Sequence, residues 1–157
     1  MVSRRREAGF TAAEILVVIT IVGIIAAIAI PSMSNLLATQ AVRGASYDLN
    51  ADLTFARAEA ISRGVNVSLI GLSGTDYKQG WRITDGTNTI RTQGARESRI
   101  TFTASSNTIT FDRTGRVVAG APAQWEILPV GTAQDYQKRC LKLDPSGRPR
   151  TNEGVCA

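Results

Sequence analysis

The sequence predicts an α+β fold in which one long N-terminal helix packs on an antiparallel β-sheet head. Two observations lead to this prediction. An apolar run at residues 10–30 continues into a stripe of helical period that ends at residues 63–64, and beyond it apolar residues alternate in short segments of period two. The 157 residues suit one domain with accessory segments.

The first element is apolar throughout residues 10–30 except at Thr11, Glu14 and Thr20. At about 1.5 Å per residue, a helix of this length matches the hydrocarbon core of a bilayer. Three arginines at residues 4–6 precede it, so we expect the start of the chain to stay cytoplasmic and the rest to be exported.

Two general interpretations fit this segment. One is a secretory signal peptide, because Ala27-Ile28-Ala29 offers a small-x-small cleavage site. The other is a plain signal anchor. Neither explains Gly9 or the acid at Glu14, because a charge inside the bilayer costs a few kcal/mol or more and needs a partner or a purpose.

The helical pattern continues after Pro31. Apolar residues recur at steps of three, four and seven along one face, at Val42, Ala45, Leu49, Ala56 and Ala60. Polar residues suit the opposite face, at Asp48, Asn50, Asp52, Arg57 and Glu59. Arg63 and Gly64 close the helix, because a cation in the last turn and a glycine just after it are typical C-terminal signals. We therefore expect one helix over residues 10–63.

Beyond Gly64 the pattern changes to that of short strands joined by turns. Asp85-Gly86 separates two of the strands as a hairpin turn would. The expected strands cover residues 65–70, 81–84, 89–91, 100–102, 108–111, 116–118, 125–128 and 141–143, the last of these closing the sheet.

The stretch Gly9-Phe10-Thr11-Ala12-Ala13-Glu14, followed by an apolar helix, resembles the class III signal of type IV pilins and pseudopilins. This resemblance implies that a prepilin peptidase cuts after Gly9 and methylates the new N-terminus at Phe10. It also implies that Glu14, the fifth mature residue, pairs with the cationic N-terminus of a neighbouring subunit. Such a pair gains much in low dielectric, so the cost of burying Glu14 alone would drive assembly.

Two further features bear on this resemblance. Pro31 falls where the family commonly carries a helix-kinking proline, and it is expected to matter for assembly. Ala12-Ala13 departs from the usual Leu-Ile, although both alanines are small and apolar.

Later motifs resemble the GspH/FimT group of minor pilins and pseudopilins. They are FARAEAISRG at residues 55–64, GWRI at 80–83, ITFDRTGR at 109–116 and SGRPR at 146–150. The resemblance covers nearly the whole chain. It implies a leader at residues 1–9, a transmembrane and filament-core helix at 10–33 and a periplasmic head at 34–157. The implied location is the bacterial inner membrane and then a cell-surface pilus.

Two cysteines, Cys140 and Cys156, lie close together near the C-terminus. In an exported protein this pair favours a disulfide, which would close the tail into a loop and stabilise it by about 3 kcal/mol. A redox-active pair is the alternative. The spacing is not Cys-x-x-Cys, however, and nothing nearby marks an activated thiolate.

The tail also carries basic residues around one acid, Asp144. Gly147 lets the backbone turn and Pro149 stiffens it, so two arginines would sit on a short exposed loop whose donor forks suit phosphate. The motif Gly147-Arg148-Pro149-Arg150 is similar to the tail of FimT-type pilins implicated in DNA uptake. The alternatives are a solvated basic loop or a contact to a neighbouring pilin. The expected DNA-binding residues are Arg148, Arg150, Lys142, Lys138, Arg139 and Gly147.

Composition argues against an enzyme. The chain has no histidine, which removes the commonest general base and metal ligand. Aspartates in the expected loops are common there for backbone reasons, and no spacing suggests a metal site. We expect no catalytic residue, cofactor, metal or small-molecule substrate. The net charge of +5 and pI of about 9.8 suit acidic partners such as nucleic acid or anionic lipid.

The expected function is a minor type IV pilin, incorporated at or near the pilus tip, that binds DNA for uptake in natural transformation. The expected partners are other pilins, prepilin peptidase, the inner membrane and DNA. One alternative is a structural or priming minor pilin without a ligand. Another is a minor pseudopilin of a type II secretion system.

Overall fold

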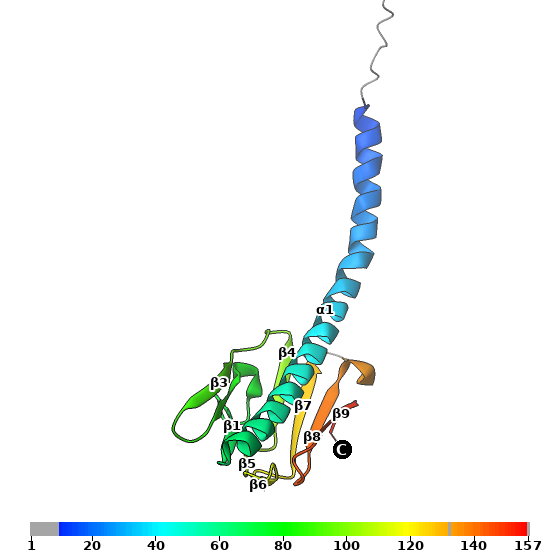
Figure 1. The fold of residues 1–157 in the computed structure, drawn as a ribbon. Coiled ribbons are helices and arrows are strands. Elements are labelled where there is room, and N and C mark those ends of the chain that lie inside the picture. Colours follow the sequence, from blue (N-terminus) through cyan, green and yellow to red (C-terminus); the bar gives the residue numbers. More distant parts are fainter. Residues whose placement is uncertain (1–9, 132, 157) are drawn as a thin grey trace, which may run out of the picture. The chain divides into compact units, whose positions relative to one another are not determined.

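A computed structural model describes residues 10–131 and 133–156, apart from the side chains of residues 30–32. The chain divides into two compact units, Met1–Leu36 and Leu37–Ala157. One helix, α1 (Ala12–Arg63, 52 residues), contributes to both units (Figure 1). The α+β fold with an N-terminal helix is confirmed, and α1 begins two residues later than predicted.

The second unit, called the head below, contains two antiparallel sheets rather than the single sheet that was predicted. The first sheet has the strand order β3-β2-β1-β5-β6 and the second has the order β4-β7-β8-β9. The strands are β1 (Val67–Gly71), β2 (Trp81–Thr84), β3 (Thr89–Gln93), β4 (Ile100–Ala104), β5 (Thr108–Phe111), β6 (Val117–Ala119), β7 (Ala123–Pro129), β8 (Arg139–Leu143) and β9 (Pro149–Glu153). Two short 3-10 helices, η1 (Tyr77–Gln79) and η2 (Asp135–Gln137), lie in the connections.

The head has one core, shared by the helix and both sheets. In Figure 1 the second half of α1 lies across the sheets, and its buried residues belong to the same cluster as residues of β1, β2, β4, β5, β7 and β8. Tyr77, Trp81 and Phe102 pack ring against ring with centroids about 6 Å apart in this core. The five predicted stripe residues of the helix are all buried, and so is Leu53, which the prediction left out.

One residue predicted for the polar face of the helix is instead buried. Only 5% of the Asp52 side chain is exposed. Its carboxylate accepts a hydrogen bond from Trp81 Nε1 at 2.9 Å and pairs with Arg91 Nη1 at 2.8 Å. The prediction was wrong here because a buried carboxylate needs partners, and these are supplied by strands far along the chain.

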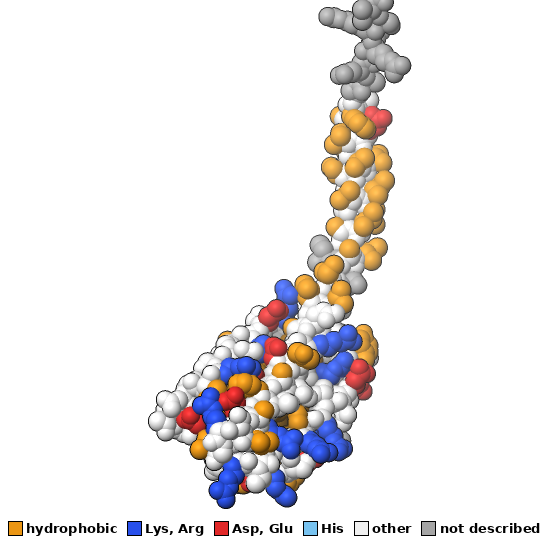
Figure 2. Space-filling view, in the orientation of Figure 1, with side chains coloured by type: hydrophobic (Ala, Val, Ile, Leu, Met, Phe, Trp, Pro, Cys, Tyr) orange, Lys and Arg blue, Asp and Glu red, His pale blue; other side chains and the backbone are white. Residues whose placement is uncertain are grey.

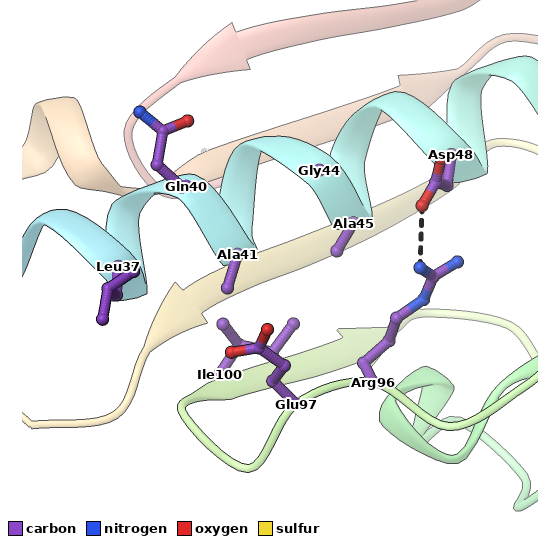
Figure 3. A pocket seen from close by; sticks show the side chains of 9 residues that line it. All are labelled: Leu37, Gln40, Ala41, Gly44, Ala45, Asp48, Arg96, Glu97 and Ile100. Atoms are coloured by element: carbon purple, nitrogen blue, oxygen red, sulfur yellow. Dashed lines mark hydrogen bonds and ion pairs between the residues drawn. The ribbon is translucent and has the colours of Figure 1, made fainter.

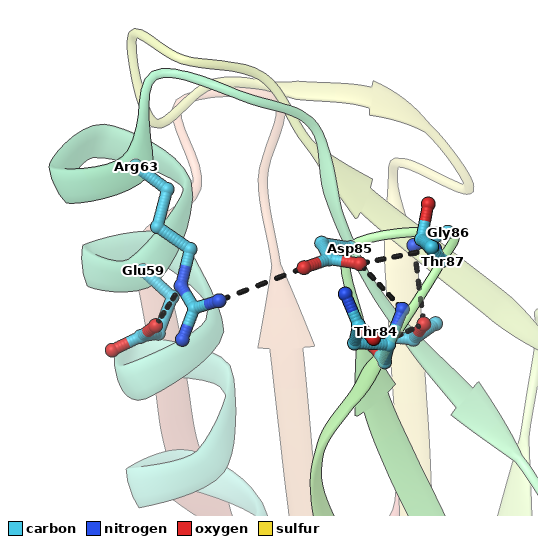
Figure 4. A network of polar contacts seen from close by, with 7 residues as sticks. Glu59, Arg63, Thr84, Asp85, Gly86 and Thr87 are labelled. Carbon is cyan, nitrogen blue, oxygen red and sulfur yellow. Dashed lines mark hydrogen bonds and ion pairs between the residues drawn. The ribbon is translucent and has the colours of Figure 1, made fainter.

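The C-terminal end of α1 is anchored to the turn between β2 and β3. Arg63 pairs with Glu59 one turn back and reaches Asp85 Oδ2 at 3.5 Å (Figure 4). Asp85 also accepts hydrogen bonds from the backbone N–H groups of Thr87 and Asn88, which shapes the turn. Gly64 follows with a φ of 67°, as the predicted C-terminal glycine requires.

The chain forms one strand more than was predicted. The expected last strand at residues 141–143 is part of β8, and β9 follows it as an edge strand of the second sheet. Leu143 lies opposite Pro149, and Lys142 lies opposite Arg150. The predicted tail loop is therefore a hairpin whose turn covers residues 144–148. This strand was not predicted because its sequence, PRTNE, has no alternating apolar residues.

Candidate functional site

The N-terminal site begins where the helix begins. Thr11 Oγ1 accepts from the Glu14 N–H at 3.3 Å, and Glu14 Oε2 accepts from the Thr11 backbone N–H at 2.8 Å and its hydroxyl at 2.9 Å. This reciprocal arrangement is a capping box, which satisfies N–H groups that the first helical turn leaves unpaired. The sequence analysis missed this local role of Glu14, although Thr-x-x-Glu is its signal. Phe10 is exposed, and Gly9 lies outside the described residues.

The helix that follows carries apolar side chains on all sides. Large hydrophobic residues from Phe10 to Ile28 are at least half exposed, and Figure 2 shows them around the segment with a single acid near its start. Among the described residues, α1 is the one helix long and apolar enough to cross a membrane. Its helical backbone runs through Pro31, whose side chain is outside the description.

The disulfide closes the C-terminal hairpin. Cys140 in β8 and Cys156 after β9 are bonded, with Cα atoms 5.1 Å apart. The Cys156 N–H also donates to Glu126 Oε1 on β7 at 3.1 Å. The end of the chain is thus tied both to its own hairpin and to the next strand of the sheet.

The hairpin turn is held by Asp144. Its Oδ1 atom accepts from the Ser146 N–H at 2.9 Å and from the Ser146 hydroxyl, and the Gly147 N–H donates to its carbonyl oxygen at 3.0 Å. The Ser146 hydroxyl is the main reason that the pKa of Asp144 lies below its ordinary value, with backbone N–H groups and the charge of Arg150 adding to it. The carboxylate therefore stays ionised while it shapes the turn.

Gly147 was expected to let the backbone turn and to belong to the DNA-binding residues, and the structure adds a packing role. Its φ is 76°, and it is buried. A Cβ here would clash with the Gly115 carbonyl oxygen of the turn between β5 and β6. Gly147 therefore packs under the turn, and the side chains that follow it reach solvent.

The predicted basic residues separate into two groups. Arg148 and Arg150 are exposed at the turn and at the start of β9. Arg139, by contrast, is only 11% exposed and pairs with Glu153 Oε1 at 3.0 Å, while its Nη1 donates to two backbone carbonyls. Lys138 pairs with Asp135 Oδ1 at 3.0 Å. The expectation that these cations crowd around a single acid is therefore corrected.

The reason for this division is strand register. Arg139 lies opposite Glu153 across the β8–β9 ladder, which places a carboxylate next to its guanidinium. Lys142 lies opposite Arg150 on the same ladder, so two like charges share one face of the hairpin near the turn. Figure 2 shows Lys and Arg side chains gathered at this end of the head, over β6 and the β8–β9 turn of Figure 1.

A groove of about 320 Å³ lies elsewhere on the head, between α1 and the chain leading into β4 (Figure 3). Its wall on α1 combines the small residues Ala41, Gly44 and Ala45 with Leu37, Gln40 and Asp48. Asp48 and Arg96 form an ion pair of 2.7 Å beside it. None of the predicted site residues lines this groove.

No metal centre is formed by the part of the chain that the structure describes. Within residues 10–131 and 133–156, no group of three or more His, Cys, Asp or Glu side chains is arranged to hold a metal ion.

Comparison with known proteins adds a family and a fold. The family model of the type II transport protein GspH matches residues 45–147. The type IV minor pilin FimU of Pseudomonas aeruginosa (strain PAO1) is 24% identical with a TM-score of 0.58, over 71% of this chain and 87% of that one. The minor pseudopilin EpsH of the Vibrio cholerae type II secretion system is 12% identical with a TM-score of 0.57, over 76% and 98%. At these identities the two structures establish the shared fold alone. No curated protein matches the chain significantly.

Proposed function

The chain belongs to the GspH family and is a minor type IV pilin or pseudopilin, and from this premise we propose that it is a pilus subunit that binds duplex DNA through the β8–β9 turn. The observation that carries the proposal is the pair Arg148 and Arg150, exposed on either side of Pro149 on a disulfide-closed hairpin. The matched family range ends just before Arg148, so the family match does not include the two arginines.

The N-terminal segment supports maturation as a pilin. We propose that prepilin peptidase cuts after Gly9, that Phe10 becomes the methylated N-terminus, and that residues 10–33 form the transmembrane and filament-core helix. Residues 34–157, which include the head described above, then form the periplasmic part of the chain. Mass spectrometry of the mature chain should give N-methylated Phe10, and a start at Pro31 or Ser32 would indicate an ordinary signal peptide instead.

The geometry of the tail supports phosphate as its ligand. Two guanidinium groups on a stiff turn present planar donor forks, which match phosphate oxygens better than flexible ammonium groups do. Lys142 lies opposite Arg150 and adds charge to the same face. Arg139 and Lys138 contribute less, because carboxylates already neutralise them. Contacts to phosphate carry no sequence information, so the binding is non-specific.

The expected affinity is modest. A few phosphate contacts from one hairpin give a dissociation constant on the order of micromolar or weaker, falling steeply with salt. Several subunits in one filament would raise the apparent affinity through avidity. A pilus tip that touches DNA repeatedly needs no tighter single site.

The test is DNA binding by the full chain in neutral-detergent micelles, measured by fluorescence anisotropy with a short labelled duplex. Arg148→Gln and Arg150→Gln should each weaken binding and lower the salt slope by about one. Arg99→Gln is the matched control, because it removes the same charge just before β4, at the opposite end of the four-stranded sheet. If both tail variants bind like the parent, the role of a structural pilin or of a secretion pseudopilin is favoured.

A further inference from the structure

Two turns of the head have the same design. Residues 112–116 (DRTGR) join β5 to β6, and residues 144–148 (DPSGR) join β8 to β9. In each turn, the side chain of the initial aspartate accepts a hydrogen bond from the backbone N–H two residues later, at 2.8 Å in the first turn and 2.9 Å in the second. In each, the glycine N–H donates to the aspartate carbonyl, and the glycine φ is 76°. An arginine follows the glycine in both turns.

These two turns contact each other. Gly147 lies against the carbonyl oxygen of Gly115, close enough that a Cβ on Gly147 would clash with it. The same carbonyl accepts from Arg57 Nε at 2.9 Å, which fixes it to α1. The Val117 N–H donates to the Pro145 carbonyl at 3.1 Å. The backbones of both turns are therefore held together, and they present one surface rather than two independent loops.

The contact brings arginines together. Arg116 and Arg148 directly follow the two glycines that touch, so their side chains start from neighbouring points of the joined backbones. Arg113 lies two residues before Gly115, and Arg150 lies three residues after Gly147. All four side chains are exposed. The basic end of the head in Figure 2 lies over these turns.

The two acids of this surface are occupied by the turns themselves. Asp112 Oδ1 accepts from the Thr114 hydroxyl at 2.6 Å, from the Thr114 N–H at 2.8 Å and from the Arg116 N–H at 3.0 Å. Asp144 makes the corresponding bonds to Ser146. These bonds orient both carboxylates toward their own turns, and the charges of Arg116 and Arg150 also act on Asp112 and Asp144 respectively.

We propose that the turn between β5 and β6 is the second half of the DNA-binding surface, with Arg113 and Arg116 contacting duplex phosphates next to those held by Arg148 and Arg150. This inference rests on the proposed DNA binding and extends it to a turn about thirty residues away in sequence.

The experiment compares three double variants of the full chain in neutral-detergent micelles with the same labelled duplex. They are Arg113→Gln/Arg116→Gln, Arg148→Gln/Arg150→Gln and the control Arg43→Gln/Arg99→Gln, and each removes two charges. Both control residues are exposed; Arg43 lies in the part of α1 that belongs to the head, and Arg99 lies just before β4. Removing one phosphate-binding arginine should lower affinity about tenfold at roughly 0.1 M salt and reduce the salt slope by about one.

The expected result is that both turn variants lose affinity and salt slope while the control keeps them, with unchanged circular dichroism throughout. If Arg113→Gln/Arg116→Gln binds like the control while Arg148→Gln/Arg150→Gln is impaired, the second turn is excluded and DNA binding by the tail stands. If both turn variants bind like the parent, the arginines of both turns are excluded as DNA contacts, and the proposed binding through the tail falls with them. Weaker binding in all three variants alike would indicate attraction by net charge only and would overturn the two-turn surface.

Discussion

At the scale of single residues, Asp52 illustrates how a charged group is accommodated in the core. Its carboxylate accepts the Trp81 indole N–H and pairs with Arg91, whose guanidinium lies 3.8 Å above the Phe55 ring centroid. One acid thereby joins α1 to β2 and β3. A partly exposed pair of this kind owes more to the satisfied indole donor than to the charge attraction, because solvent screens Arg91.

Replacing Asp52 tests this account. Asp52→Ala should lower the free energy of unfolding by about 1–3 kcal/mol, because the buried indole N–H loses its acceptor. Asp52→Asn keeps an oxygen for Trp81 and should cost less. Urea denaturation of the head followed by tryptophan fluorescence measures both. Equal losses for the two variants would show that charge, not the indole bond, determines the cost.

Glu14 has two roles that substitution can separate. Glu14→Ala removes both the capping box and the charge, whereas Glu14→Gln keeps an acceptor for the Thr11 N–H and removes the charge alone. If pairing with a neighbouring N-terminus drives assembly, both variants should be processed and inserted normally but enter filaments poorly. Immunoblots of sheared pili measure incorporation, and the mass of the mature N-terminus is the control for processing. Normal incorporation of the glutamine variant would leave only the capping role.

At the scale of elements, the β8–β9 hairpin depends on a disulfide for its stability. β9 is an edge strand with almost no buried side chain, so apolar packing contributes little to its stability. The Cys140–Cys156 bond closes a segment with a sequence separation of 16 and ties the end of β9 to β8. The same bond therefore holds the turn that carries Arg148.

Removing the bond should destabilise the hairpin by a predictable amount. Cys140→Ser and Cys156→Ser should each lower the free energy of unfolding by about 3 kcal/mol, and the double variant should lose no more than either one. Thermal unfolding with and without reductant measures this, since the reduced parent should match the variants. Additive losses in the double variant would mean that the two side chains contribute separately and not as a bridge.

At the scale of the whole molecule, stability should respond to acid but not to pH near neutrality. Hydrogen bonds, chiefly from the Asn88 backbone, the Thr114 hydroxyl and the Ser146 hydroxyl respectively, hold the pKa values of Asp85, Asp112 and Asp144 below their ordinary value of 3.8. A carboxylate whose pKa is lowered by folding stabilises the native state above its unfolded pKa. That stabilisation is lost as pH falls through the lowered value.

The free energy of unfolding of the head should therefore be flat from about pH 5 to 8, where no histidine titrates, and should fall below about pH 4. Urea denaturation at a series of pH values measures the curve. Asp112→Asn should reduce the fall, and its curve should approach that of the parent at the lowest pH. A marked change in parent stability between about pH 6 and 8 would contradict this assignment.

The sequence by itself determined the features that depend on local chemistry. Helical periodicity predicted α1 and five of its buried residues, and alternation predicted β2 and β5 with the bounds that they have. The end of the helix at Arg63-Gly64 was also predicted, because helix capping depends on neighbouring residues. The disulfide was predicted because the chain has only two cysteines that could pair in an exported protein. Thr-x-x-Glu was equally local, and the capping box was missed only because the charge of Glu14 suggested a membrane role instead.

Only the tertiary structure decided the features that depend on distant partners. Asp52 is buried because Trp81 and Arg91 lie against it, and no periodicity along α1 encodes those two contacts. The polar strand β9 forms because it pairs with β8 and because the disulfide ties its end to that strand. The meeting of the two arginine turns likewise depends on the packing of Gly147 on Gly115, across two sheets. Such contacts join segments that are tens of residues apart, and a pattern read along the chain reports only what neighbouring residues do.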